Sequence, residues 1–166
     1  MAVVQREILT IGYEGTDTGE LIAALRAARV ATLVDVRDVP WSRRHEFAKR
    51  SLSEALARHG IGYRHLKGLG NPKAGRDAAR AGDLAAYRAI FAAHLDSATA
   101  RADLAAAAEM LGRERACLMC YERDPARCHR AIVAERLAAL TGLAVRHLVV
   151  AGEPAGDSEP SQPLLL

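Results

Sequence analysis

The sequence predicts a single α/β domain of three layers: a mostly parallel sheet of about five strands with helices on both faces. Short apolar segments alternate along the chain with longer segments whose apolar residues repeat at helical spacing. Strands separated by helices are typical of parallel crossovers, which place helices over the sheet. A chain of 166 residues, half of them apolar, has the size of one ordinary domain. We expect this domain to span residues 1–151 and residues 152–166 to form a disordered tail.

Five short segments are the candidate strands. They are Ile8–Ile11, Thr32–Val36, Ile61–Leu66, Ala116–Met119 and Val145–Val150. Between them, Asp17 with Glu20 and Ser51 with Glu54 have the spacing of capping boxes, so each pair predicts the start of a helix. Gly60 would end the second of these helices.

The second half of the chain predicts three more helices. Helical spacing runs from Asp83 to Leu95 and again over about 100–111, after a loop that contains Gly and Lys. Asp124 followed by Pro125 is a cap with proline at the first helical position. We expect a last helix from there to about Thr141.

The net charge of +3 is unevenly distributed. Twenty Arg, three Lys and many Ala are typical of a GC-rich genome, so the Arg count alone says little about phosphate binding. The positions of the basic residues are more informative. The segments 37–50, 64–76 and 121–130 together carry a net charge of +8, and the rest of the chain carries −5. All three segments follow expected strands, and ligands of open parallel sheets bind beyond the carboxyl ends of the strands. The pattern therefore predicts a basic cleft at that edge.

Composition excludes several classes of protein. Aromatic residues are only 4% of the chain, too few for a sheet that stacks nucleic-acid bases. No apolar segment approaches the roughly 20 residues of a membrane helix, and the first residues lack the pattern of a signal peptide. Three cysteines without a disulfide pattern indicate a reducing compartment. We expect a cytoplasmic protein whose thiols serve chemistry rather than cross-links.

One acidic and one basic residue lie near the end of the second strand. Asp35 lies in a strand expected to be buried, where a carboxylate is costly unless it is paired. Arg37 points to the same side of the strand and is its candidate partner. Asp35 either acts on a ligand or ties down the following loop. In that loop Arg43 and Arg44 suit a phosphate or carboxylate, the alternative being a solvated basic loop.

Cys120 is the candidate nucleophile. It ends the fourth strand just before a helix, and the helix N-terminus and nearby arginines would lower its pKa. The alternative is a buried thiol, the reading that we favour for Cys117 and Cys128. Zinc is disfavoured, because three residues along a strand reverse the side-chain face and because Cys128 and His129 would diverge as neighbours on a helix. We expect no metal and no cofactor, the alternative being a metal held by His65, Glu122 and His129, since single histidines and carboxylates have no diagnostic spacing.

Six motifs in order resemble the DUF488 family, over about residues 8–150. They are TIGYEG, LVDVR, PWSRR followed by Phe47, Tyr63-x-His65-Leu66 with Leu69-Gly70, Cys120-x-Glu122, and Cys128-His129-Arg130. Many members have Gly-His where this chain has Gly12-Tyr13. The family is uncharacterised, so the resemblance implies a compact α/β domain and marks positions without supplying a reaction. The marked positions are Gly12, Asp35, Arg37, Arg43, Arg44, His65, Cys120, Glu122, Cys128, His129 and Arg130.

Strand ends and motifs together predict an enzyme that acts on an anionic ligand, a nucleotide or a component of nucleic acid. Cys120 would be nucleophile or thiol carrier, with Glu122 or His129 moving a proton. The ligand would contact Arg37, Arg43, Arg44, His65, Arg130, Asp35, Gly12 and Tyr13. Two alternatives stay open. One is a nucleic-acid-binding module without catalysis, and the other is a structural or partner-binding domain whose polar residues hold the loops.

Overall fold

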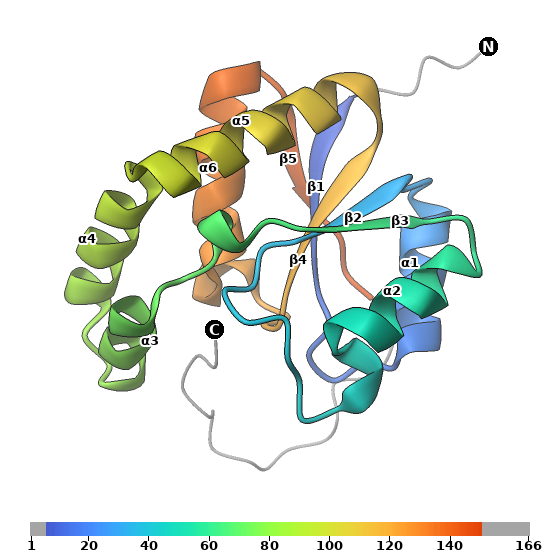
Figure 1. Ribbon diagram of the computed structural model, residues 1–166, viewed down its shortest axis with the longest axis horizontal. Coiled ribbons are helices and arrows are strands. Elements are labelled where there is room, and N and C mark those ends of the chain that lie inside the picture. The colour runs from blue at the N-terminus through green and yellow to red at the C-terminus, as the bar shows by residue number, and fades with distance from the viewer. Residues whose placement is uncertain (1–5, 151–166) are drawn as a thin grey trace.

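The computed structural model describes residues 6–150, and the expected tail lies outside this range. It contains a five-stranded parallel sheet with helices on both faces, as predicted (Figure 1). The strands are β1 (Glu7–Gly12), β2 (Thr32–Asp35), β3 (Gly62–His65), β4 (Ala116–Cys120) and β5 (Ala144–His147). The α-helices are α1 (Thr18–Ala27), α2 (Lys49–Ala57), α3 (Lys73–Arg80), α4 (Leu84–Leu95), α5 (Ala98–Arg113) and α6 (His129–Thr141). Short 3-10 helices are η1 (His45–Phe47), η2 (Lys67–Leu69) and η3 (Pro125–Arg127).

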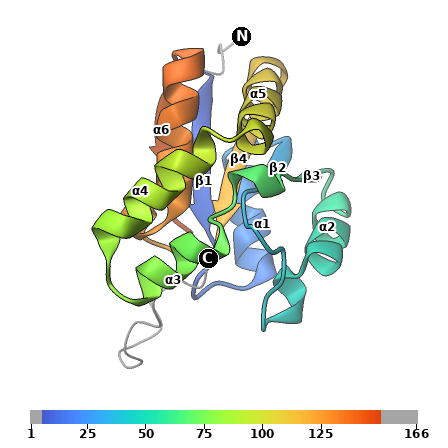
Figure 2. The same cartoon turned by 60° about the vertical axis from the view of Figure 1, so that its left-hand side comes forward.

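The strand order is β3-β2-β4-β1-β5. Figure 2 shows α1 and α2 on one side of this sheet and α4 and α6 on the other. The alternation of strand side chains explains the two layers of core. In β4, Leu118 and Cys120 pack with α4, α5 and α6, whereas Cys117 and Met119 pack with α1 and α2. Cys117 and Cys120 therefore face opposite sides, as expected from their spacing.

Two predicted helix boundaries need correction, and one helix was not predicted. The capping box at Asp17 and Glu20 is present, but α2 begins at Lys49 without a side-chain cap, so Ser51 does not start it. Residues 73–80 form helix α3, where we expected a loop. Asp124 caps η3 instead of the last α-helix, which begins at His129.

Candidate functional site

The carboxyl ends of β1, β2 and β4 bring the predicted site residues to one edge of the sheet. Gly12 is in register with Cys120, and Asp35 with both Met119 and His65. A Cβ atom at Gly12 would overlap the carbonyl group of Glu122, so the segment after β4 can cross the end of β1 only because residue 12 is glycine. Gly12 thus shapes the edge through its backbone.

Asp35 and Arg37 form a buried ion pair. The Nε atom of Arg37 donates to Oδ1 of Asp35 at 2.9 Å, and its Nη2 atom donates to Oδ2 at 2.7 Å. The backbone N–H of Arg37 also donates to Oδ1, at 3.0 Å, and the hydroxyl of Tyr63 donates to Oδ2. The remaining guanidinium nitrogen of Arg37, Nη1, donates to the hydroxyl of Tyr13 at 3.2 Å. The pairing is as predicted, and its geometry ties down the start of the loop.

The other candidate ligand-binding residues differ in exposure. Arg43 is exposed, and Arg44 is partly exposed, with its guanidinium 4.7 Å from the centre of the Phe47 ring and bonded to the carbonyl of Thr16. His65 is half-buried, with Nε2 2.6 Å from the carbonyl oxygen of Arg37. Tyr13 is buried and stacks on Phe47 at 4.3 Å between ring centroids. Arg43 and Arg44 are therefore the arginines of this group that still face solvent.

Cys120 and Cys128 are joined in a disulfide. This differs from the expectation of free thiols. The reason lies in the path of the chain: η3 turns it back after β4, so that the N-cap of α6 returns to the end of that strand. Cys117 remains a free, fully buried cysteine on the opposite face. Its burial raises the pKa of this thiol.

Arg130 is fully buried beside this disulfide. Its Nη1 atom lies 3.2 Å from Sγ of Cys120 and also donates to the carbonyl of Glu122. Its Nη2 atom donates to the carbonyl of Arg123 at 3.2 Å, and its Nε atom to the hydroxyl of Thr10 at 3.1 Å. These donors hold the segment after β4, and they leave Arg130 committed to internal partners.

Glu122 carries a buried polar atom that has no hydrogen-bond partner within residues 6–150. Its side chain is 6% exposed, Oε2 lies 3.6 Å from Sγ of Cys120, and Oε1 has no hydrogen bond to any described residue. Burial raises the pKa of this carboxyl group to about 8. The carboxyl group of Glu122 therefore lies next to the Cys120 sulfur, which carries no proton while the disulfide is intact.

His129 is fully buried, and Nε2 lies 2.6 Å from the carbonyl oxygen of Val36. Burial lowers its pKa to about 4, so the ring is neutral near pH 7. Its Nδ1 atom lies 3.8 Å from Sγ of Cys128. Cys128 precedes the helix in an extended conformation, so the expectation that helical geometry separates these two side chains is wrong.

A pocket of about 810 Å³ borders the disulfide. Cys128 lies in its wall with 3% of its surface exposed, whereas Cys120, behind it, is 0% exposed. The wall consists of residues from α3, α4, the segment between these helices, η3 and α6. They are Ala79, Gly82, Leu84, Tyr87, Arg88, Ala92, Pro125, Ala126, Arg127, Cys128, Ala131, Ile132 and Glu135. Arg88 and Arg127 are exposed, and the hydroxyl of Tyr87 is buried without a hydrogen-bond partner among described residues.

The amino-acid sequence does not predict this pocket as a site. Tyr87 belongs to the apolar stripe of α4, where an aromatic residue normally indicates core packing. From the sequence, we expect Cys128 to be a small buried hydrophobic side chain. The Cys128-His129-Arg130 motif is the signal in the sequence that marks a segment of the pocket wall.

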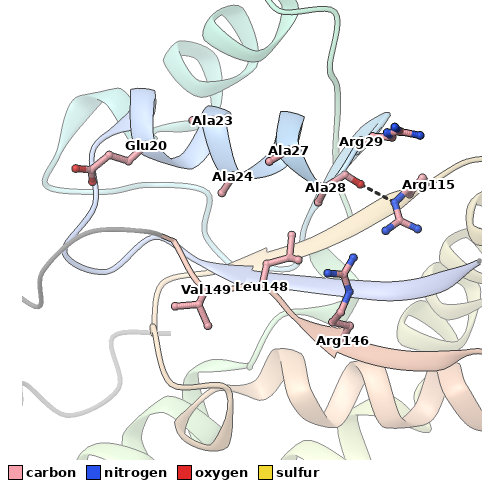
Figure 3. Close-up of a pocket in the computed structure, with 10 residues that line it drawn as sticks. All are labelled: Glu20, Ala23, Ala24, Ala27, Ala28, Arg29, Arg115, Arg146, Leu148 and Val149. Carbon is pink, nitrogen blue, oxygen red and sulfur yellow. Dashed lines mark hydrogen bonds between the residues drawn. The ribbon is translucent and has the colours of Figure 1, made fainter. Parts of the chain in front are cut away.

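A second pocket, of about 670 Å³, lies between α1 and the segment formed by β5 and the residues directly after it (Figure 3). Alanines of α1 form one wall, and Arg29, Arg115 and Arg146 lie at one end. Arg115 donates to the carbonyl of Ala28 at 2.6 Å. None of the predicted site residues lines this pocket, so the chemistry-bearing side chains gather at the first pocket and the sheet edge.

The family model described as a domain of unknown function, DUF488, matches residues 17–137. This range includes both the Asp35–Arg37 pair and the disulfide with its neighbours. The chain belongs to the DUF488 family. The resemblance seen in the motifs is thereby confirmed. Comparisons with curated proteins and with solved structures found no significant match.

The DUF488 domain thus forms two buried polar clusters at one edge of its sheet. In one, Asp35 and Arg37 are joined by Tyr13 and Tyr63. The other, which we call the cysteine cluster, consists of Cys120, Glu122, Cys128, His129 and Arg130. The bond from His129 to the carbonyl of Val36 connects them. Within residues 6–150, no helix has the length and apolar character needed to cross a bilayer.

Proposed function

We propose that this DUF488 domain is an enzyme that acts on a small anionic ligand through thiol–disulfide exchange at Cys120 and Cys128. One observation carries the proposal: a disulfide with one sulfur in the wall of a pocket of about 810 Å³ and the other beside a buried arginine. A purely structural disulfide needs neither the pocket nor the arginine. In this proposal the sulfur of Cys128 reacts first, whereas the sequence favoured Cys120 as the nucleophile.

The arginines of the pocket support an anionic ligand. Arg88 and Arg127 are exposed in its wall, against one acidic residue, Glu135. The expected contacts of Arg37 and Arg130 with the anionic ligand have less support, because the guanidinium groups of both residues donate to internal acceptors. For the same reason a nucleic-acid-binding groove that uses all the basic segments has less support than a compact pocket.

The proposed reaction begins with a thiolate of the ligand attacking Sγ of Cys128. The Cys120–Cys128 bond breaks, its electron pair leaves on Cys120, and a mixed disulfide forms on Cys128. Arg130, at 3.2 Å, stabilises the departing thiolate, and Glu122 supplies its proton. A second ligand thiolate then attacks the mixed disulfide and releases Cys128 as a thiolate. Two ligand thiols become one disulfide, and the protein gains the two electrons; the same two steps in reverse, with a second disulfide ligand as the oxidant, re-form the Cys120–Cys128 bond.

Two small thiols that differ in charge test the proposal. The oxidised protein is mixed with 2-mercaptoethanol or with 2-mercaptoethanesulfonate, and the loss of the disulfide is followed by mass spectrometry. We expect the anionic thiol to react faster, relative to its rate with a disulfide-bonded model peptide. The preference should shrink in Arg127→Ala and at high salt, and should persist in Arg58→Ala, which removes an exposed arginine outside the pocket.

Two results would contradict the proposal. One is that neither thiol reduces the disulfide of the folded protein. The other is that both thiols react in the ratio seen with the model peptide, because the pocket would then contribute no recognition of charge.

A further inference from the structure

The cysteine cluster offers a second chemistry once its disulfide is reduced. The two sulfur atoms and Nδ1 of His129 all lie within 4.8 Å of one another, and all three side chains are buried. Thiolate sulfur and imidazole nitrogen are the ligands that zinc prefers in proteins. We propose that the reduced domain binds one Zn²⁺ ion through Sγ of Cys120, Sγ of Cys128 and Nδ1 of His129.

The distances fit a tetrahedral ion. Zinc–sulfur and zinc–nitrogen bonds of about 2.3 and 2.0 Å place sulfur and nitrogen ligands about 3.5 Å apart and two sulfur ligands about 3.8 Å apart. Sγ of Cys128 and Nδ1 of His129 are already separated by 3.8 Å. The Cα atoms of Cys120 and Cys128 lie 7.3 Å apart, which leaves room for the two sulfurs to separate around an ion after reduction.

His129 presents the correct nitrogen. The carbonyl oxygen of Val36 only accepts hydrogen bonds, so Nε2, at 2.6 Å, must carry the ring proton. Nδ1 of the neutral ring then has a free lone pair directed at the cysteines. Metal-binding histidines characteristically donate their other ring N–H to such a carbonyl, which fixes the ring orientation.

Glu122 is the candidate for the fourth position. Its Oε2 atom lies 3.6 Å from Sγ of Cys120, and its Oε1 atom is buried without a partner among the described residues. Two thiolates and one carboxylate around Zn²⁺ would leave one negative charge in the interior. Arg130, 3.2 Å from Sγ of Cys120, balances that charge. Such a centre would give a cation to the carboxylate of Glu122, whose Oε1 atom has no partner among the described residues, and a negative counter-charge to Arg130.

Zinc and the disulfide exclude each other. A dithiol reductant converts the disulfide to two thiols, supplying two electrons and two protons, and is itself oxidised to a disulfide. Zinc binding then releases the two thiol protons. This inference uses the residues of the proposed function but does not rest on the exchange reaction, because it requires only that the two cysteines be reduced.

The test is a metal titration of the reduced full-length protein, cleared of metal with a chelator. Co²⁺ is added first, because thiolate ligands and tetrahedral geometry give it distinctive charge-transfer and visible absorption bands. We expect one equivalent to saturate both bands, and Zn²⁺ to abolish them by displacement. Cys120→Ser and Cys128→Ser should each lose the charge-transfer intensity of one thiolate and bind more weakly, whereas Cys117→Ser should bind as the wild type does.

His129→Gln provides a separate check. A glutamine side chain keeps a donor for the carbonyl of Val36 but offers no nitrogen at the position of Nδ1. We expect affinity for Zn²⁺ to fall by roughly 100-fold, with circular dichroism unchanged. An unchanged affinity in this folded variant would remove His129 from the site.

The wild-type titration is decisive without any variant. Reduced, folded protein that gives no tetrahedral cobalt spectrum would overturn the inference, as would unchanged binding in the Cys120 and Cys128 variants. The thiol-exchange assay uses oxidised, metal-free protein, so its outcome is independent. Loss of zinc binding alone would leave the proposed function intact, and loss of exchange alone would leave the zinc site intact.

Discussion

Arg44 and Arg130 show how residues of one type serve different purposes at the same sheet edge. Arg44 remains partly exposed, with its side chain over the Phe47 ring. Arg130 is fully buried and gives its donors to Thr10 and to the carbonyls of Glu122 and Arg123. Because a buried acceptor without a donor is costly, Arg130 holds the segment that carries the cysteines. A basic residue in the sequence therefore does not by itself indicate a ligand contact.

Arg130→Met should destabilise the protein strongly. The change keeps apolar volume but leaves several buried acceptors unpaired, and we expect the free energy of unfolding to fall by about 3–5 kcal/mol. Urea denaturation followed by circular dichroism measures the change. Arg58→Ala, at an exposed site, should stay within about 0.5 kcal/mol of the wild type. A loss in Arg130→Met no larger than in this control would refute the structural role of Arg130.

Asp35→Asn tests the second buried pair. It leaves the guanidinium of Arg37 in the interior without its counter-charge, so we expect a loss of about 3 kcal/mol in the free energy of unfolding. The double variant Asp35→Asn with Arg37→Met should lose less than the sum of the two single changes, because the unpaired charge is then absent. Additive losses would mean that the two side chains do not interact.

The sequence predicted one of the two side-chain pairings at this edge of the sheet and not the other. The sequence predicted the Asp35–Arg37 pair from the two-residue period of a strand; the pair is present, but β2 ends at Asp35 and the backbone N–H of Arg37 turns onto the same carboxylate. The Cys120–Cys128 pairing depends on the tight turn of η3. The expectation of a longer helix starting at Asp124 placed Cys128 inside that helix, and so predicted the wrong direction for its side chain.

At the scale of elements, the close crossing of β1 by the segment after β4 shapes the site. Gly12 permits this crossing, since its neighbour Glu122 would overlap a side chain there. The failure to predict one helix from the sequence also has a physical cause. Helix α3 buries only Gly75 and Ala79, so it carries no apolar stripe to predict it. The strands were found because their apolar segments are short and bounded by turn residues.

Gly12→Ala should lower the free energy of unfolding by at least about 2 kcal/mol, because the new methyl group forces two backbone segments apart. Gly112→Ala is the matched control. It lies in α5 with open space around a Cβ atom, so it should be neutral or stabilise by up to about 1 kcal/mol. Thermal denaturation of both variants checks the difference. Equal effects would contradict the close contact at Gly12.

At the scale of the whole molecule, the strand order explains why the two polar clusters meet. The order β3-β2-β4-β1-β5 places β4 between β2 and β1, so Asp35 and Gly12 flank the end of the strand that carries Cys120. The alternation of elements predicted the parallel sheet but not this order. The order of the strands depends on which face of the sheet each connection crosses. The strands are short, apolar and similar in composition, so the sequence of a single strand does not indicate its neighbours.

Reduction should change the stability of the molecule in two opposite steps. Closing a loop across eight residues of sequence separation stabilises a chain by about 2–3 kcal/mol through the entropy of the unfolded state. Reduced protein in a chelator should lose about this amount in urea denaturation, and one equivalent of Zn²⁺ should restore stability. No loss upon reduction would mean that the disulfide does not constrain the unfolded chain.

The accessibility of the cysteines tests the central claim most directly. The protein is reduced, exposed to iodoacetamide near neutral pH while folded and metal-free, and mapped by peptide mass spectrometry over time. We predict that Cys128, in the pocket wall, is modified first, and that Cys120 and Cys117, which are both fully buried, react only after unfolding. Modification of Cys117 as fast as Cys128, or no modification of Cys128 before unfolding, would contradict a reactive cysteine pair at the pocket.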